Sequence, residues 1–178
     1  MADHTTRCQI TLGGNLAASI PYREPVLALL LADARAVVAG PEGRRSGRLA
    51  DIFSGSLHLR PGEILVQVVV DADQTTLRHA ASKRTRLDWV DYPLVTLALI
   101  DDGEAIRLAV GGMAAAGPFR DPSLEAIVSD RRASPAERAR RAVAALPADV
   151  VDDVHASARY RRFVFACALA DMLELLGG

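Results

Sequence analysis

The sequence predicts an α+β protein in which antiparallel sheets come first and helices come last. Asp101-Asp102-Gly103 separates two apolar runs, and Gly40-Pro41-Glu42-Gly43 lies between the run at 34–39 and a return segment at 44–49; both patterns are typical of β-hairpins. Apart from Glu24-Pro25, the signals that start helices, an acidic or hydroxyl residue followed by proline, lie from Asp121 onward. This order of strands and then helices favours an α+β fold over a doubly wound parallel sheet.

The composition indicates a folded protein without a strongly charged partner. The chain has 178 residues, 50% of them hydrophobic, which is enough for a substantial core. Its formal net charge of −1 excludes an overall basic footprint for nucleic acid. Cys8 and Cys167 have no CxxC spacing, and the four histidines are scattered, so no metal site is expected. With neither a signal peptide nor a membrane-length apolar run, we expect a cytoplasmic protein.

In the first half of the chain we expect a strand, a helix, a hairpin and a second strand. The strand over residues 6–12 leads into Gly13 and Gly14, and the helix covers residues 24–32. The hairpin joins residues 34–39 to 44–49. The alternation of apolar residues over 63–70 predicts a strand that is buried on most of both faces.

In the second half, the pattern predicts an antiparallel set of strands covered by helices. The expected strands cover residues 76–81, 90–100 and 104–110. Helices are predicted to begin after Asp121, after Ser134 and near Ser157, and the last should end near Leu176, largely buried against the second sheet. Of three basic clusters, at 83–86, 131–132 and 138–141, the last two are expected to be solvated surface.

The stretch Thr11-Leu12-Gly13-Gly14-Asn15 carries the clearest chemical signal. Two adjacent glycines allow a sharp turn, and successive exposed N–H groups in such a turn can form a concave site for an anion such as phosphate. Thr11 and Asn15 would add a hydroxyl and an amide. Glycine pairs are also common in ordinary turns, so a plain turn is the alternative interpretation.

Six segments in order resemble the FAD-binding (medium) subunit of the molybdenum hydroxylases, the family of xanthine dehydrogenase and carbon monoxide dehydrogenase. They are TLGGNLAASIPYRE, LADIFSG, LRPGEIL, KRTRLDWVDYPLV, IRLAVGGMAAAGPFR and DDVHASARYRRFV. The resemblance extends from about Thr6 to Leu176. It implies two parts, a second FAD-binding-like subdomain over residues 1–72 and a flavoprotein C-terminal α+β domain over residues 73–178.

The resemblance also implies which residues would contact FAD. The TLGGN-like loop would hold the pyrophosphate, Glu24 takes the place of an acidic residue near the cofactor, and Leu65 matches a leucine that lines the flavin site. Lys83 matches a lysine near the flavin, where a cation can stabilise a reduced isoalloxazine. Plain core packing for Leu65 and a solvated charge for Lys83 are the alternatives. The cofactor-binding residues implied are Thr11, Gly13, Gly14, Asn15, Glu24, Leu65 and Lys83.

Departures from the family pattern keep a second function open. The family's first FAD-binding subdomain has no equivalent in this sequence, and the Met1-Ala2-Asp3 start resembles a natural start. In addition, His155 replaces an arginine in the DDxRxSxxYR pattern, whose other residues fit a helix cap. One hypothesis is electron transfer through FAD beside molybdopterin and iron–sulfur subunits. The alternative is a derivative without FAD that binds a small molecule or acts as a non-redox enzyme.

For that alternative, the ionisable residues that would serve a new site are Glu24, His58, Lys83 and Asp91. A third hypothesis is a structural or assembly module. On any of the three, apolar surface that the family's first subdomain would cover must be buried in another way, so we expect a homo-oligomer or partner subunits.

Overall fold

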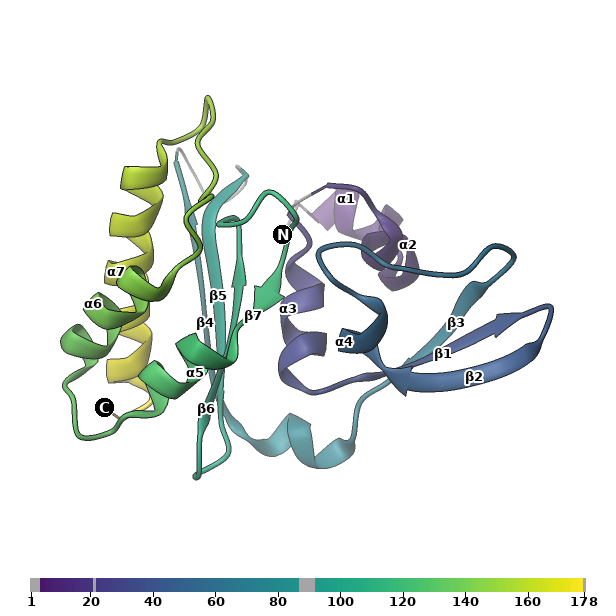
Figure 1. Cartoon of the computed structure of the whole chain (residues 1–178), viewed down its shortest axis with the longest axis horizontal. Coiled ribbons are helices and arrows are strands. Elements are labelled where there is room, and N and C mark those ends of the chain that lie inside the picture. Colours follow the sequence, from purple (N-terminus) through teal and green to yellow (C-terminus); the bar gives the residue numbers. More distant parts are fainter. Residues whose placement is uncertain (1–3, 21, 87–91, 178) are drawn as a thin grey trace.

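The computed structural model of the chain describes residues 4–20, 22–86 and 92–177. It contains a three-stranded and a four-stranded antiparallel sheet with helices between and beside them (Figure 1). The predicted α+β class is confirmed. No helix among the described residues is long and apolar enough to cross a membrane.

The three-stranded sheet has the order β2-β1-β3 and follows three helices. Helices α1 (His4–Gln9), α2 (Leu12–Ala17) and α3 (Glu24–Leu31) precede strands β1 (Arg35–Gly40) and β2 (Gly43–Arg48), the short helix α4 (Leu49–Ile52) and strand β3 (Ile64–Val69). The predicted hairpin and the helix at 24–32 are confirmed. The strand predicted over 6–12 is wrong, because α1 and the start of α2 occupy those residues.

Strand β3 also corrects the prediction of burial on both faces. It lies at the edge of its sheet and pairs only with β1. Leu65 and Val68 pack on the inner core of this sheet, whereas Ile64 and Val66 are 65% and 46% exposed. The apolar alternation therefore marks an edge strand whose outer face is still largely apolar.

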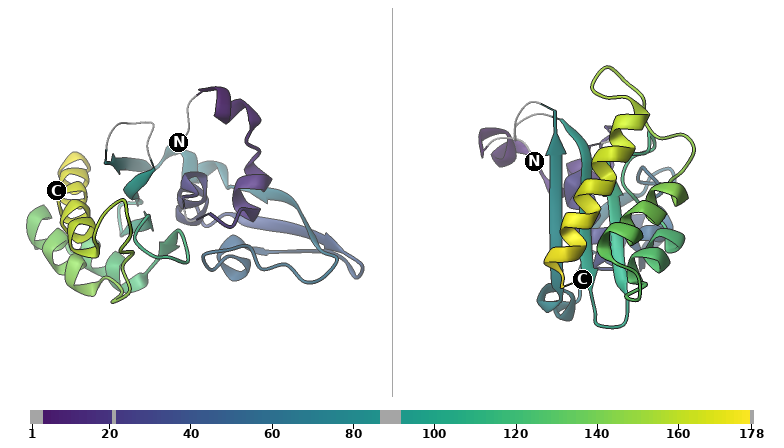
Figure 2. Two further views of the ribbon diagram at one scale, coloured as in Figure 1. Left: turned by 90° about the horizontal axis from the view of Figure 1, so that it is seen from above. Right: turned by 90° about the vertical axis from the view of Figure 1, so that its left-hand side faces the viewer.

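The four-stranded sheet has the order β4-β5-β6-β7 and is covered on both faces. After the 3₁₀ helix η1 (Ala72–Thr76) come β4 (Arg78–Thr85), β5 (Pro93–Asp101), β6 (Ile106–Gly111) and β7 (Phe119–Arg120). Helices α5 (Pro122–Ser129), α6 (Pro135–Ala145) and α7 (Ala158–Leu175) cover one face, and α3 covers the other (Figures 1 and 2).

Alternate residues of β5 serve these two layers. Val95, Leu97 and Leu99 belong to the core beneath α7, and Ile100 on the opposite face packs with Leu27 and Leu31 of α3. Val26 and Leu30 of helix α3 pack in the core of the three-stranded sheet, so this helix packs against both sheets.

The helix starts predicted in the second half are confirmed. Asp121 accepts a hydrogen bond from the amide of Ser123, Ser134 from that of Glu137, and Ser157 from that of Tyr160. Helix α7 lies across β4 and β5 as expected (Figure 2, right), although Phe163 on its outer side is 63% exposed.

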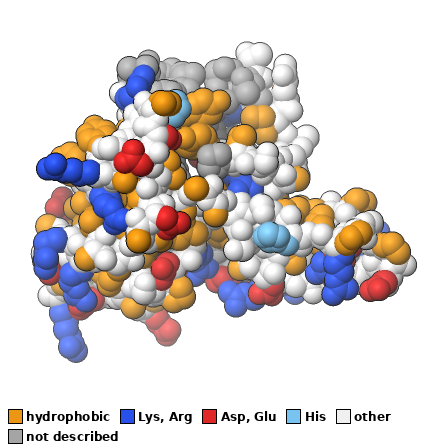
Figure 3. Space-filling model, turned by 45° about the horizontal axis from the view of Figure 1, so that its top comes forward, with side chains coloured by type: hydrophobic (Ala, Val, Ile, Leu, Met, Phe, Trp, Pro, Cys, Tyr) orange, Lys and Arg blue, Asp and Glu red, His pale blue; other side chains and the backbone are white. Residues whose placement is uncertain are grey.

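The basic cluster at 138–141 is only partly the solvated surface that was predicted. Basic side chains gather over the C-terminal helices on the left of Figure 3. Arg140 pairs with Glu137 at that surface, but Arg138 is fully buried and donates to the carbonyl of Val128 at 2.8 Å. Burial lowers the pKa of the Arg138 guanidinium from its usual value.

Candidate functional site

The TLGGN stretch forms the N-terminal turn of α2 and not a glycine turn after a strand. Thr11 is the N-cap, and its hydroxyl accepts a hydrogen bond from the amide of Gly14 at 3.0 Å. Neither Gly13 nor Gly14 has a positive φ, so the predicted nest conformation is wrong, and the free amides at this place are those of a helix start.

The two glycines have different surroundings. A Cβ on Gly14 would lie 2.9 Å from the Thr11 Oγ1, so this glycine is needed for the cap. A Cβ on Gly13 would meet no atom of the described residues within 4 Å. The backbone of Gly13 is therefore open to an approaching group, and an anion there would face the positive end of the helix.

Asn15 lies in α2, and Leu65 lies in strand β3. The Oδ1 of Asn15 is buried and accepts no hydrogen bond from the described residues. Leu65 is half-buried and packs against the core of the three-stranded sheet, which fits the core interpretation of this residue.

Glu24 and Lys83 form an ion pair between the first turn of α3 and strand β4. The Nζ of Lys83 lies 3.0 Å from the Oε1 of Glu24, and the side chains are 22% and 15% exposed. Two residues that were implied separately by the resemblance are thus brought into contact. Lys83 is consequently not the solvated charge of the alternative interpretation.

The remaining ionisable residues suggested for a new site do not join this pair in the described structure. His58 is exposed and lies near Ser54 and Ser56 in the loop after α4. Asp91 lies outside the described residues. No group of three or more His, Cys, Asp or Glu side chains that could hold a metal ion occurs among the residues described.

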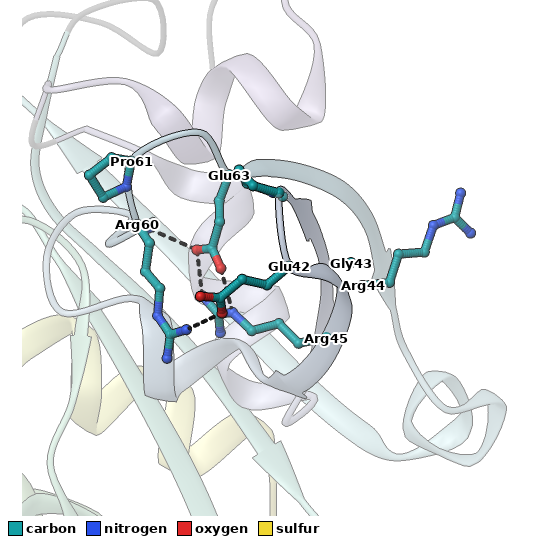
Figure 4. A pocket seen from close by; sticks show the side chains of 9 residues that line it. Glu42, Gly43, Arg44, Arg45, Arg60, Pro61 and Glu63 are labelled. Atoms are coloured by element: carbon teal, nitrogen blue, oxygen red, sulfur yellow. Dashed lines mark hydrogen bonds and ion pairs between the residues drawn. The ribbon is translucent and has the colours of Figure 1, made fainter.

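A cavity of about 340 Å³ lies between the β1–β2 turn and the loop before β3 (Figure 4), and no motif in the sequence predicts it. Glu63 points into it, and its carboxylate accepts hydrogen bonds from the Nε of Arg45 at 2.8 Å and from the Nη2 of Arg45 at 2.7 Å. The same carboxylate accepts a hydrogen bond from the backbone amide of Arg60 at 2.8 Å. Arg44 points away. The cluster is a closed ion-pair network that fixes the turn to the loop.

This network makes a prediction for acid stability. The hydrogen bonds from Arg45 and from the Arg60 amide outweigh burial and lower the pKa of Glu63 from 4.5 to about 2. A depressed carboxyl pKa stabilises the fold above the unfolded value and loses that contribution as the pH falls through the folded value. We expect Glu63→Gln to flatten the loss of stability between pH 4.5 and pH 2, as measured by urea unfolding at several pH values.

Glu42→Gln is the matched control for this experiment. The Glu42 side chain is 89% exposed and lies 3.5 Å from Arg60, so its removal should leave the pH profile unchanged. A wild-type slope retained in Glu63→Gln would contradict the prediction.

The comparisons with known proteins agree with the implied family. Residues 1–71 match the family model described as the FAD binding domain in molybdopterin dehydrogenase. Their match includes six of the seven residues implied to contact FAD, and Lys83 lies beyond it.

Solved structures show that the FAD-binding subunit fold extends over nearly all of the chain. Quinoline 2-oxidoreductase from Pseudomonas putida 86 matches with a TM-score of 0.82 and 23% identity over 99% of this chain. Carbon monoxide dehydrogenase from Hydrogenophaga pseudoflava gives 0.83 and 23% over 98%, and that from Oligotropha carboxidovorans gives 0.80 and 24% over 98%. In each case the chain spans 63% of the length of the matched chain.

Within this FAD-binding fold, sequence reasoning missed the buried arginines. Arg23, Arg138 and Arg161 are at most 2% exposed. Each of them donates to at least one backbone carbonyl, and no charge pattern in the sequence shows which carbonyls these are. Arg23 and Arg161 lie in the TLGGNLAASIPYRE and DDVHASARYRRFV motifs and Arg138 lies in the basic cluster at 138–141, but none of these patterns predicts burial.

Proposed function

We propose that this chain binds FAD with the pyrophosphate at the N-terminal turn of α2, as the FAD-binding component of a molybdenum hydroxylase-type assembly. The open backbone of Gly13 is the observation that carries the proposal, since no atom of the described residues occupies the space where its Cβ would be. The Thr11 cap and the free amides of the helix start lie in the same turn. These residues fit a dinucleotide phosphate.

Each proposed residue has a defined task. Thr11 and Gly14 hold the helix start, Gly13 and Asn15 face the pyrophosphate, and Leu65 supports the sheet beside it. Lys83, kept in place by Glu24, supplies a cation toward the flavin. When bound, FAD supplies the redox chemistry and passes electrons between partner centres and an acceptor. None of these side chains acts as a nucleophile or a general base.

The proposed partners are molybdopterin and iron–sulfur subunits, because the similar chains include one from a carbon monoxide dehydrogenase that contains copper and molybdenum. We also propose that the chain works as a homo-oligomer or in a complex with such partner subunits.

Gly13→Ala separates binding from folding. The new methyl group clashes with none of the residues that the structure describes, and alanine favours a helix by about 0.5–1 kcal/mol over glycine, so the melting temperature should stay or rise. FAD affinity should fall at least tenfold, because the methyl group fills the space of the pyrophosphate. Titration with FAD, followed by absorbance and by flavin fluorescence, measures this change.

Gly47→Ala is the matched control, because a Cβ there would come no closer than 4.0 Å to another group and lies in β2. It should bind FAD as the wild type does. Gly14→Ala should lose stability through the Thr11 cap by about 1 kcal/mol. A wild-type chain that does not bind FAD, even with partner subunits present, would refute the proposal and favour a small-molecule site without FAD.

The ion pair between Glu24 and Lys83 predicts an effect on the flavin itself. Lys83→Met should shift the reduction potential of bound FAD to a more negative value, because a cation near the isoalloxazine favours the reduced form. The potential is measured by reductive titration against a reference dye. Arg84→Met is the control, because it removes an exposed cation that lies on the same strand as Lys83 and pairs with Asp171 of α7. This variant should leave the reduction potential unchanged.

A further inference from the structure

Arg23 is a buried cation at the junction of three segments. It is 2% exposed and immediately precedes Glu24 at the start of α3. Its guanidinium donates to the carbonyl of Ala18 at 2.9 Å and, at 3.5 Å each, to those of Leu16 and Ala116. It also donates to the carbonyl of Gly55. Arg23 therefore joins the end of α2, the loop after α4 and the loop before β7.

These contacts are built around carbonyl groups and an aromatic ring. The guanidinium lies 5.0 Å from the centre of the Phe53 ring, a cation–π distance. Burial lowers its pKa, yet an arginine remains charged at neutral pH. An apolar side chain would avoid this desolvation cost. The role of the cation is therefore to bind carbonyl oxygens from several segments.

Two glycines allow the loops to close on Arg23. Gly55 has φ +71° and Gly117 has φ +113°, values that other residues rarely adopt. A Cβ on Gly117 would lie 2.5 Å from the Arg23 Nη2, and one on Gly55 would lie 2.3 Å from the carbonyl oxygen of Ala116. Both glycines belong to the segments LADIFSG and IRLAVGGMAAAGPFR, which the proposed FAD contacts leave unexplained.

Arg23 acts on the same helix that carries the proposed pyrophosphate site. The carbonyls of Leu16 and Ala18 lie at the C-terminal end of α2, where a cation is favourable for the helix dipole. Helix α2 has only six residues, and so short a helix needs an anchor to persist. Its opposite end carries Thr11 and Gly13.

We infer that Arg23 is the positioning residue of the FAD site, which it keeps in place by anchoring the C-terminal end of α2 to the loop after α4 and to the loop before β7. The inference rests on the proposed function. It requires that Arg23 affects FAD affinity without contacting FAD, because Arg23 fixes the position of α2.

The test compares Arg23→Lys with Arg138→Lys. Lysine keeps the charge but has one ammonium group, which cannot span the carbonyls on both sides of Arg23. Arg138 is also buried and donates to a carbonyl, but it lies in α6 on the far side of the four-stranded sheet. FAD titration and hydrogen exchange of a peptide covering residues 11–18 are measured for both variants and for the wild type.

We expect Arg23→Lys to weaken FAD binding at least tenfold and to speed exchange at residues 11–18 at least tenfold. Arg138→Lys should change neither, even where both variants lose a similar amount of thermal stability. An unchanged affinity and exchange in Arg23→Lys, or an equal effect of Arg138→Lys, would overturn the inference.

Hydrogen exchange separates this inference from the proposed function. If the wild type does not bind FAD, the proposed function fails and the role of Arg23 in fixing α2 is decided by exchange alone. Faster exchange at residues 11–18 in Arg23→Lys but not in Arg138→Lys then supports the anchor, and unchanged exchange refutes it.

Discussion

Replacing Arg161 with methionine is expected to lower the free energy of unfolding by about 3–5 kcal/mol, because it leaves two buried carbonyl groups and a carboxylate without their donor. Arg161 is fully buried and donates to the carbonyls of Leu94 at 2.7 Å and Gly112 at 3.0 Å. It also binds both carboxylate oxygens of Asp153 at 2.8 and 2.9 Å. Methionine fills part of the space but leaves these oxygens without their donor.

The Asp153 carboxylate gives the same contact a pH dependence. Burial would raise its pKa, but hydrogen bonds from the amides of Ala156 and His155 and from Arg161 outweigh that effect and lower the pKa below 3.8. The contribution to stability is therefore complete above pH 3.8 and is lost as the pH falls through the depressed value. In Arg161→Met the pKa of Asp153 should lie closer to its usual value, so this loss of stability on acidification should be smaller.

Urea unfolding followed by far-UV circular dichroism measures both effects. Arg159→Met is the control, because Arg159 is exposed two residues earlier on the same helix. Its free energy of unfolding should stay within about 0.5 kcal/mol of the wild type. A loss of similar size in both variants would show that the carbonyl and carboxylate contacts of Arg161 are not what stabilises this part of the protein.

The second large effect is expected for Phe165→Ala, with a loss of about 3–5 kcal/mol. Phe165 is fully buried in the core between α7 and the four-stranded sheet, among Leu97, Leu99 and Val110. Removing the ring leaves a cavity in the largest core cluster, which the two layers of helix and sheet cannot close by small shifts.

Phe163→Ala provides a comparison on the same helix. Phe163 is 63% exposed, so the same change in chemistry should alter stability by less than about 0.5 kcal/mol. Thermal and urea unfolding of both variants give the two values. Equal losses would mean that the outer side of α7 is covered in the folded protein under the conditions of measurement, and dilution would then reveal a concentration dependence.

Local signals in the sequence predicted local features of the fold well. Asp121, Ser134 and Ser157 each cap the helix that was predicted to follow them, because a cap depends on residues within three positions. The hairpin joining β1 and β2 was found for the same reason, from the turn around Gly40 and Gly43.

Features that depend on distant segments were wrong or missed. Residues 6–12 alternate like a strand, but the Thr11 cap and the packing of Leu16 favour helices there. The contact between Glu24 and Lys83 joins a helix to a strand far along the chain, and only the family resemblance placed both near one cofactor. Arg23 is surrounded by carbonyls from three segments. Because every residue has a backbone carbonyl, the sequence does not show which of them bind Arg23.

Helix α3 has a consequence for how the protein can be divided. The proposed boundary between residues 72 and 73 separates the two sheets along the chain, but Leu27 and Leu31 of α3 pack on the second sheet while Val26 and Leu30 pack on the core of the first. A fragment ending at residue 72 would expose the first pair of leucines, and a fragment beginning at residue 73 would expose Ile100 and Ala109. The two halves, produced as separate polypeptides, should therefore remain poorly folded alone and recover structure when mixed, as complementing fragments do.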